Sequence, residues 1–268
     1  MEAITPGLQG TPPGAQARAA PVAIVPAAGT ASRLGRLAGS KELLPIGFER
    51  RPDGSSRPRP AIAYLLDGLA AAGVERVLVA LRAGKWDLPA YLADGAERGM
   101  ALAYVVLEHS PHVLATVAAA LPWTEGREVA LGFPDILFRP ADAYARILAR
   151  LRTTDAELVL GLFPTGQCEK TDMVELGPEG RPVALAIKQP DRGLRYTWSI
   201  AAWSPGFSRW LAAFAAGAPR DREVHFGEAI QAAIERGRRV EAVVFDDGDY
   251  LDVGTADDLE RAMRRALR

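Results

Sequence analysis

Short apolar runs alternate with longer amphipathic stretches along the chain from Pro21 onward. A run such as Val22–Val25 is typical of a strand buried on both faces. The stretch Ala61–Ala72 places apolar residues at spacings of three and four, which predicts an amphipathic helix. The alternation as a whole predicts an α/β fold in which helices cover both faces of a mostly parallel sheet. Further strands are predicted at 76–81, 102–107, 128–131 and 157–162, and further helices at 88–94, 116–121 and 141–151.

The alternation loosens after Leu162, where the pattern favours a smaller antiparallel portion. Thr255 directly precedes the last predicted helix and is a candidate cap. No repeat or linker divides the chain, so we expect a single domain over residues 21–268. Residues 1–20 are rich in Gly, Pro and Ala and are expected to form a flexible arm. The elements predicted here are a hairpin of 173–176 with 183–187, strands at 196–203 and 240–245, and helices at 207–215, 227–236 and 256–267.

The stretch Gly47–Pro60 follows neither the helical nor the strand period. Its composition favours a solvated surface loop. The alternative is a mobile basic lid beside a phosphate site. Four arginines give it that basic character: Arg50, Arg51, Arg57 and Arg59.

Composition narrows the functional classes. The formal net charge of -1 argues against a general nucleic-acid binder, which usually carries a basic excess. The only cysteine, Cys168, excludes an internal disulfide and a cysteine-rich zinc site. No apolar run approaches the roughly 18 residues of a membrane span, and the first 20 residues lack the apolar core of a secretory signal. We therefore expect a cytoplasmic enzyme or binding protein.

The residues after the first predicted strand form a candidate phosphate site. Small side chains there let the backbone approach a polyphosphate closely, and the cations Arg33 and Lys41 would offset the charge on its oxygens. The alternative is an ordinary strand-to-helix turn with surface cations. The small residues directly before Arg33 are Ala28, Gly29, Thr30, Ala31 and Ser32.

Two carboxylates follow predicted strands in other parts of the chain. Asp135 lies in the segment LGFPDILF and Asp252 in YLDVGT. Two carboxylates at strand ends can hold one Mg2+, which prefers oxygen ligands. Each Asp alone is more typical of a turn or a helix cap. Together with the candidate phosphate site they indicate nucleotidyl transfer, in which a phosphate oxygen attacks the α-phosphorus and pyrophosphate leaves.

These motifs resemble those of the sugar-1-phosphate nucleotidyltransferases, most closely the short form that includes glucose-1-phosphate thymidylyltransferase. The family pattern G-G-x-G-T-R-L, followed by a lysine before L-L-P-I, resembles Ala28–Leu34 and Lys41–Ile46. Its G-D-N resembles Gly132–Asp135 with two residues interposed, and its D-I-G-T matches Asp252–Thr255. The resemblance covers roughly residues 21–268. It implies a Rossmann-like sheet with a small antiparallel substrate-binding portion.

The resemblance also implies roles and partners. Arg33 would stabilise the phosphoryl group in transfer, Lys41 would contact the acceptor phosphate or α-phosphate, and the backbone of residues 28–32 would bind the triphosphate. Asp135 and Asp252 would hold Mg2+. The substrates would be a nucleoside triphosphate, with dTTP or UTP favoured, and a sugar-1-phosphate. Proteins of the short form often assemble as homo-oligomers.

The chain departs from the family at positions that recognise substrate. The second loop glycine is Ala31, and the Q-x-x-x-x-G that reads the base appears as Glu108 and Val113. The acidic residue of E-K-P is Lys188, and a glycine near the sugar is Trp198. Trp198 and Trp203 are five positions apart on one predicted strand. Side chains alternate along a strand, so the two indoles should lie on opposite faces, and one of them could line the acceptor pocket.

These departures leave alternatives open. Lys188 and Trp198 favour cytidylyl transfer to a non-sugar phosphate or phosphonate. The altered positions would also fit a nucleotide-binding regulator without catalysis. A glycosyltransferase is less well supported, because Asp135 is followed by Ile136 and Leu137 rather than completing a D-x-D motif. His109 and His112 are expected to be surface or hydrogen-bonding residues, since no cysteine or third partner accompanies them.

Overall fold

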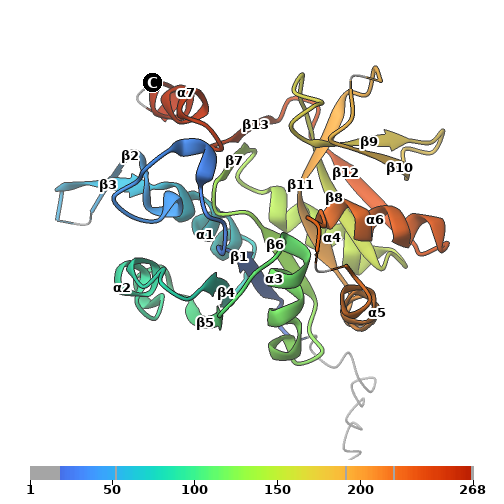
Figure 1. The fold of residues 1–268 in the computed structure, drawn as a ribbon, viewed down its shortest axis with the longest axis horizontal. Helices are drawn as coiled ribbons and strands as arrows, with labels where there is room; N and C mark the ends of the chain where they lie inside the picture. The colour runs from blue at the N-terminus through green and yellow to red at the C-terminus, as the bar shows by residue number, and fades with distance from the viewer. Residues whose placement is uncertain (1–18, 52, 191, 220, 267–268) are drawn as a thin grey trace, which may run out of the picture.

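In the computed structural model, the described residues are 19–51, 53–190, 192–219 and 221–266. A nine-stranded sheet runs in the order β10-β9-β11-β6-β1-β4-β5, and β8 lies between β11 and β12 (Figure 1). The first half is parallel, because β1 pairs with β4 and β6, and β4 with β5. The strands are β1 Val22–Pro26, β4 Arg76–Arg82, β5 Ala101–Leu107, β6 Val129–Gly132, β8 Leu158–Pro164, β9 Asp172–Leu176, β10 Pro182–Ile187, β11 Tyr196–Trp203 and β12 Val240–Val244.

Helices pack on both faces of this sheet. On one face α1 (Ala61–Ala71) and α4 (Ala143–Thr153) bury apolar residues against the strands, and on the other α3 (Val113–Ala120), α5 (Pro205–Ala216) and α6 (Phe226–Glu235) do the same. Figure 1 shows α3 and α5 next to each other. The mostly parallel sheet with helices on both faces is therefore confirmed. None of the described helices has the length and apolar character needed to cross a membrane.

The second half is antiparallel around β11, which pairs with β6, β8 and β9. The strands β9 and β10 form the hairpin that the sequence predicts. A separate ribbon of β7 (Ile136–Arg139) and β13 (Asp249–Asp252) leads into α7 (Ala256–Ala266). The Thr255 hydroxyl accepts from Asp258 N at 3.3 Å, so the expected cap of α7 is confirmed. Most of the arm expected at residues 1–20 lies outside the described residues.

The expectation of an irregular loop over residues 47–60 is wrong. β2 (Pro45–Arg50) and β3 (Ser56–Pro60) pair as an antiparallel hairpin. Proline is tolerated there because the two strands pair only with each other and leave outer edges free. Two arginines of β3 are held by carboxylates: Arg57 by Glu49 and Glu97, and Arg59 by Asp67 at 2.6 Å.

Candidate active site

Residues 27–41, the nucleotide loop, connect β1 to a short 3-10 turn at the carboxyl edge of the parallel strands. Ala27 N donates to Ala80 O of β4 at 2.7 Å, which fixes the start of the loop. Ala31 has φ 56 and ψ 28, in the left-handed region. Glycine adopts this conformation without strain, whereas a residue with a Cβ pays about 1 kcal/mol. Ala31 therefore has the backbone conformation that the family's glycine would favour.

The structure brings the four predicted catalytic and metal-binding side chains together. Lys41 forms an ion pair with Asp135. The β7–β13 ribbon pairs Asp252 with Ile136, and Val253 N donates to Asp135 O at 2.9 Å. A Cβ built on Gly254 would lie 3.3 Å from Arg33 Nη2 and 3.3 Å from both carboxylate oxygens of Asp252. Gly254 is thus the small residue that lets Arg33 and Asp252 lie close together.

The charged groups of Lys41, Asp135 and Asp252 are largely buried and interact with one another. Burial, followed by the neighbouring Asp135 carboxylate, raises the pKa of Asp252 to about 6. Burial alone would lower the pKa of Lys41, but Asp135, Glu42 and Asp252 raise it above its ordinary value. Lys41 therefore stays charged and offsets two carboxylates that repel each other.

Asp135 and Asp252 fit the requirements of a Mg2+ site. Burial first, and the neighbouring Asp135 carboxylate second, raise the pKa of Asp252, and a divalent cation bound between the two carboxylates would offset both effects. Mg2+ is commonly held by one or two carboxylates together with water and substrate phosphates. Within the described residues no group of three or more His, Cys, Asp and Glu side chains is placed to hold a metal. Any ion here would take its remaining ligands from water and substrate.

Two residues that the sequence reasoning missed anchor the nucleotide loop. Lys85 Nζ donates to Ala27 O at 2.7 Å and forms a buried ion pair with Glu42, at 2.7 Å from both carboxylate oxygens. Asp87 accepts from Ser40 N at 2.6 Å and from Ser40 Oγ at 2.8 Å. Lys85 and Asp87 come shortly after the predicted strand at 76–81. Their position after a parallel strand could have indicated from the sequence that they lie at the same edge of the sheet as the nucleotide loop.

A hollow of about 430 Å³ lies between the nucleotide loop and the segment 82–87. Arg82 and Trp86 line it, opposite Gly29, Thr30 and Lys41. It is concave, polar and cationic, as a site for a polyphosphate must be.

The two predicted base-reading residues lie outside the lining of this hollow. Glu108 is 89% exposed at its side chain. Val113 begins α3 and packs partly against the core. His112 caps α3 by accepting from Ala115 N at 3.1 Å, which agrees with the hydrogen-bonding role expected for it.

The expectation that Trp198 and Trp203 point to opposite faces is wrong. A β-bulge in β11 shifts the register between Trp198 and Ile200, so the pleat no longer alternates regularly. Both indoles pack in one core cluster and contact Phe226, with ring centroids 5.5 Å and 5.9 Å away. Trp198 also contacts Phe133, which is two residues from Asp135.

Lys188 lies at the end of β10 with φ 45, and its Nζ is 3.2 Å from His225 Nδ1. Asp172 lies near both residues. Burial raises the pKa of Asp172, and His225, Lys188 and Trp198 oppose that rise. The structure thus places Lys188 in a charged cluster on the antiparallel side of the sheet.

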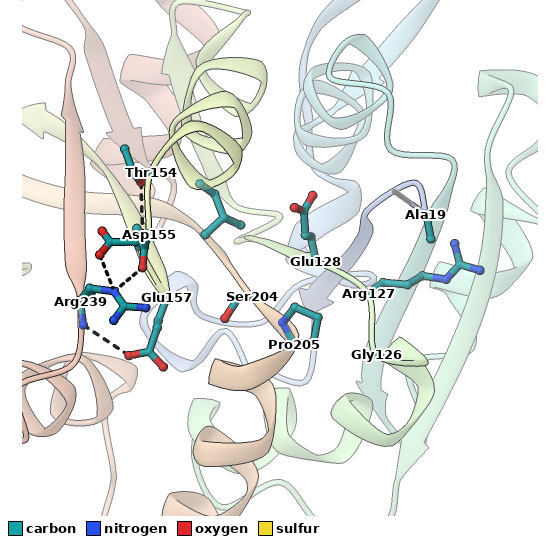
Figure 2. Close-up of a pocket in the computed structure, with 12 residues that line it drawn as sticks. Ala19, Gly126, Arg127, Glu128, Thr154, Asp155, Glu157, Ser204, Pro205 and Arg239 are labelled. Atoms are coloured by element: carbon teal, nitrogen blue, oxygen red, sulfur yellow. Dashed lines mark hydrogen bonds and ion pairs between the residues drawn. The ribbon is translucent and has the colours of Figure 1, made fainter. Parts of the chain in front are cut away.

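A further hollow of about 480 Å³ lies at the opposite edge of the sheet, where β1, β6 and β8 begin. Figure 2 shows Arg239 bound to Asp155 and Glu157 on one side, with Glu128 and Arg127 across from them. None of the predicted site residues lines it.

A model of the MobA-like NTP transferase domain family matches residues 23–168, more than half of the chain. A structure described as a glucose-1-phosphate thymidylyltransferase from Bacillus anthracis, in complex with sucrose, is similar with a TM-score of 0.80 and 17% identity, over 92% of this chain and 95% of that one. A UTP-bound UGPase from Acinetobacter baumannii is similar with a TM-score of 0.73 and 16% identity, over 92% of this chain and 93% of that one.

A comparison with curated protein sequences gave no significant match. At such low identities the two structural likenesses establish the fold. Together with the family match they confirm the expected Rossmann-like architecture and the resemblance to the sugar-1-phosphate nucleotidyltransferases.

Proposed function

Because the chain belongs to the MobA-like NTP transferase family, we propose that it is a Mg2+-dependent nucleotidyltransferase that joins a nucleoside monophosphate to a phosphorylated small molecule. The observation that carries the proposal is the convergence of Arg33, Lys41, Asp135 and Asp252 beside the nucleotide loop. These residues come from distant parts of the chain. Their positions suit charge stabilisation around a phosphoryl group.

In this reaction an oxygen of the acceptor phosphate attacks the α-phosphorus of the NTP. The bond to the bridging oxygen breaks, and pyrophosphate leaves with the electron pair. The nucleotide loop would bind the triphosphate through backbone N–H groups. Arg33 would stabilise the leaving phosphates and Lys41 would orient the attacking phosphate. Asp135 and Asp252 would hold Mg2+, which when bound screens the negative charge of the phosphoryl oxygens.

For the substrates we favour dTTP or UTP and a sugar-1-phosphate. The names of the two similar structures support this choice, since one is described as a glucose-1-phosphate thymidylyltransferase and the other is bound to UTP. The cluster of Lys188 with His225 supports a second candidate, cytidylyl transfer to a non-sugar phosphate or phosphonate, because it adds positive charge where the family has an acidic residue.

The test is pyrophosphate release across a matrix of four NTPs and phosphorylated acceptors, with Mg2+ and with EDTA. We expect turnover for one base with Mg2+ and a loss of about 100-fold or more in Arg33→Ala and Asp252→Ala. Arg239→Ala, at the opposite edge of the sheet, serves as the control and should keep full activity. Tight NTP binding without turnover for any acceptor would instead identify a nucleotide-binding regulator.

A further inference from the structure

The buried pair Lys85–Glu42 lies directly beneath the nucleotide loop. Their side chains are 7% and 1% exposed; Lys85 borders the hollow beside the loop, and its ammonium is paired with Glu42. A buried ion pair gives little net stability, because desolvation offsets its attraction. The placement of this pair under the loop therefore needs another explanation.

The contacts of Lys85 supply one. Besides Glu42, its ammonium donates to Ala27 O at 2.7 Å and to Gly29 O at 3.4 Å. These are carbonyls of alternate peptide units in the nucleotide loop. In a trans peptide the carbonyl oxygen and the following N–H point in opposite directions. Lys85 thereby turns the N–H groups of Ala28 and Thr30 away from itself.

Gly29 and Thr30 are exposed and line the hollow, whereas Ala28 is buried at the start of the loop. Within the described residues, the N–H groups of Ala28, Gly29 and Thr30 donate to no backbone acceptor. A row of free N–H groups beside the cation Lys41 forms an oxyanion site. Glu42 neutralises Lys85, so the attraction for phosphate comes from the oriented peptides and not from the charge of Lys85.

Glu42 connects the two ends of this arrangement. It follows Lys41 in the sequence, so its ion pair with Lys85 ties the backbone of Lys41 to the peptides of Ala27 and Gly29. The cation and the N–H groups thus keep a fixed separation, which a triphosphate spanning both requires.

We propose that Lys85, held by Glu42, is a positioning residue that orients the peptides of the nucleotide loop for the phosphates of the NTP. This inference rests on the proposed function. It assigns Lys85 and Glu42 to nucleotide affinity and leaves acceptor binding to other residues.

The test compares Lys85→Met and Lys85→Met/Glu42→Leu with the wild type. The double variant removes both buried charges and should fold, since apolar replacement of a buried ion pair is often neutral for stability. We expect both variants to bind UTP, or the NTP preferred in the substrate matrix, about tenfold or more weakly by calorimetry. The KM for that NTP should rise accordingly, while the KM for the acceptor changes less than about threefold.

Two further variants separate positioning from a merely structural role. Glu42→Gln keeps the shape and an acceptor for Lys85, so NTP affinity should stay within about threefold of the wild type. Arg150→Met/Glu241→Leu breaks an ion pair at the opposite edge of the sheet and should leave NTP affinity unchanged. Unfolding curves of every variant show whether a change in affinity reflects lost structure.

A folded double variant with wild-type NTP affinity would overturn the inference. If the double variant fails to unfold cooperatively, Lys85→Arg is the deciding variant. The planar guanidinium of arginine cannot make the same contacts as an ammonium, so NTP affinity should drop while the denaturant midpoint stays unchanged. Unchanged NTP affinity in Lys85→Arg would refute the inference. A wild type that binds NTP without turnover refutes only the transferase activity, since affinities still test Lys85. A wild type that binds no NTP overturns both.

Discussion

Arg33 and Lys41 carry the same charge in different surroundings. Lys41 is largely buried and paired with Asp135, whereas Arg33 is exposed beside Gly254 and Asp252. Lysine at position 41 therefore has a structural task besides the catalytic one proposed for it, because it compensates two carboxylates even when no substrate is bound. Arg33 also favours the charged form of Asp252, but it is exposed, so water screens its charge more strongly than that of Lys41.

Replacing Lys41 should consequently affect stability where replacing Arg33 does not. In buffer with EDTA, Lys41→Met should lower the free energy of unfolding by about 1–3 kcal/mol, because it leaves buried carboxylates without a counter-charge. Arg33→Met should stay within about 0.5 kcal/mol of the wild type. Urea denaturation measures both. Equal stability of the two variants would show that Lys41 does not compensate these carboxylates.

The raised pKa of Asp252 predicts how stability depends on pH. The native state holds the proton more tightly than the unfolded chain, whose carboxyl has an ordinary pKa of 3.8. In metal-free buffer the free energy of unfolding should therefore fall as pH rises from about 4 to about 6, by about 1–3 kcal/mol. Asp252→Asn should remove this component. Denaturant midpoints at several pH values test it, and identical slopes in wild type and variant would contradict it.

At the element scale, the structure distinguishes two apolar residues of β2. Ile46 is 2% exposed and packs with Leu251, Val253 and Ala262, whereas Phe48 is 64% exposed. These contacts join the hairpin to the segment that carries Asp252. The hairpin is thus part of the framework of the site rather than a mobile lid.

Ile46→Ala should accordingly destabilise the chain by about 2–4 kcal/mol through lost burial and the cavity that remains. Phe48→Ala, on the same strand, is the matched control and should cost less than about 1 kcal/mol. Chemical denaturation compares them. A larger effect at Phe48 would show that this ring is covered in solution.

The helices and strands predicted well from sequence are those in which the spacing of apolar residues reflects which side chains are buried. β1, α1 and α4 have clear apolar patterns, and their predicted ranges fall within a few residues of the observed ones. The hairpin was missed because pairing between two mostly exposed strands leaves no apolar alternation. The bulge in β11 was missed because it depends on a partner: Gly161 of β8 faces Ile200, and a Cβ there would lie 2.4 Å from Ile200 Cγ1.

The candidate site shows the same division. Arg33, Lys41, Asp135 and Asp252 could be chosen from sequence because each stands in a recognisable motif, and the fold brings them together. Lys85 stands in no such motif. Its importance arises from tertiary contacts with loop carbonyls and with Glu42, and these appear only once β1 and β4 lie side by side.

At the scale of the whole molecule, the two halves share one sheet. β11 comes late in the sequence but lies between β6 and β8, with Trp203 opposite Val129 on one side and Leu158 on the other. The family match ends at residue 168, whereas Asp252 lies far beyond it. The second half therefore contributes both a central strand and a carboxylate of the candidate site.

This shared sheet predicts that a fragment of residues 19–168 does not fold alone. Without β11, β6 and β8 lose their common partner, and the core around Trp203 and Phe226 is missing. The fragment should lack a cooperative thermal transition by circular dichroism, whereas the full chain should unfold in one transition with coincident circular dichroism and tryptophan fluorescence. The buried indoles Trp198 and Trp203 lie in the second half, whereas Trp86 and Trp123 of the first half are already exposed in the native state, and circular dichroism follows the helices of both halves. A folded fragment, or two separate transitions in the full chain, would mean that the halves are independent domains and that nucleotide binding could survive without Asp252.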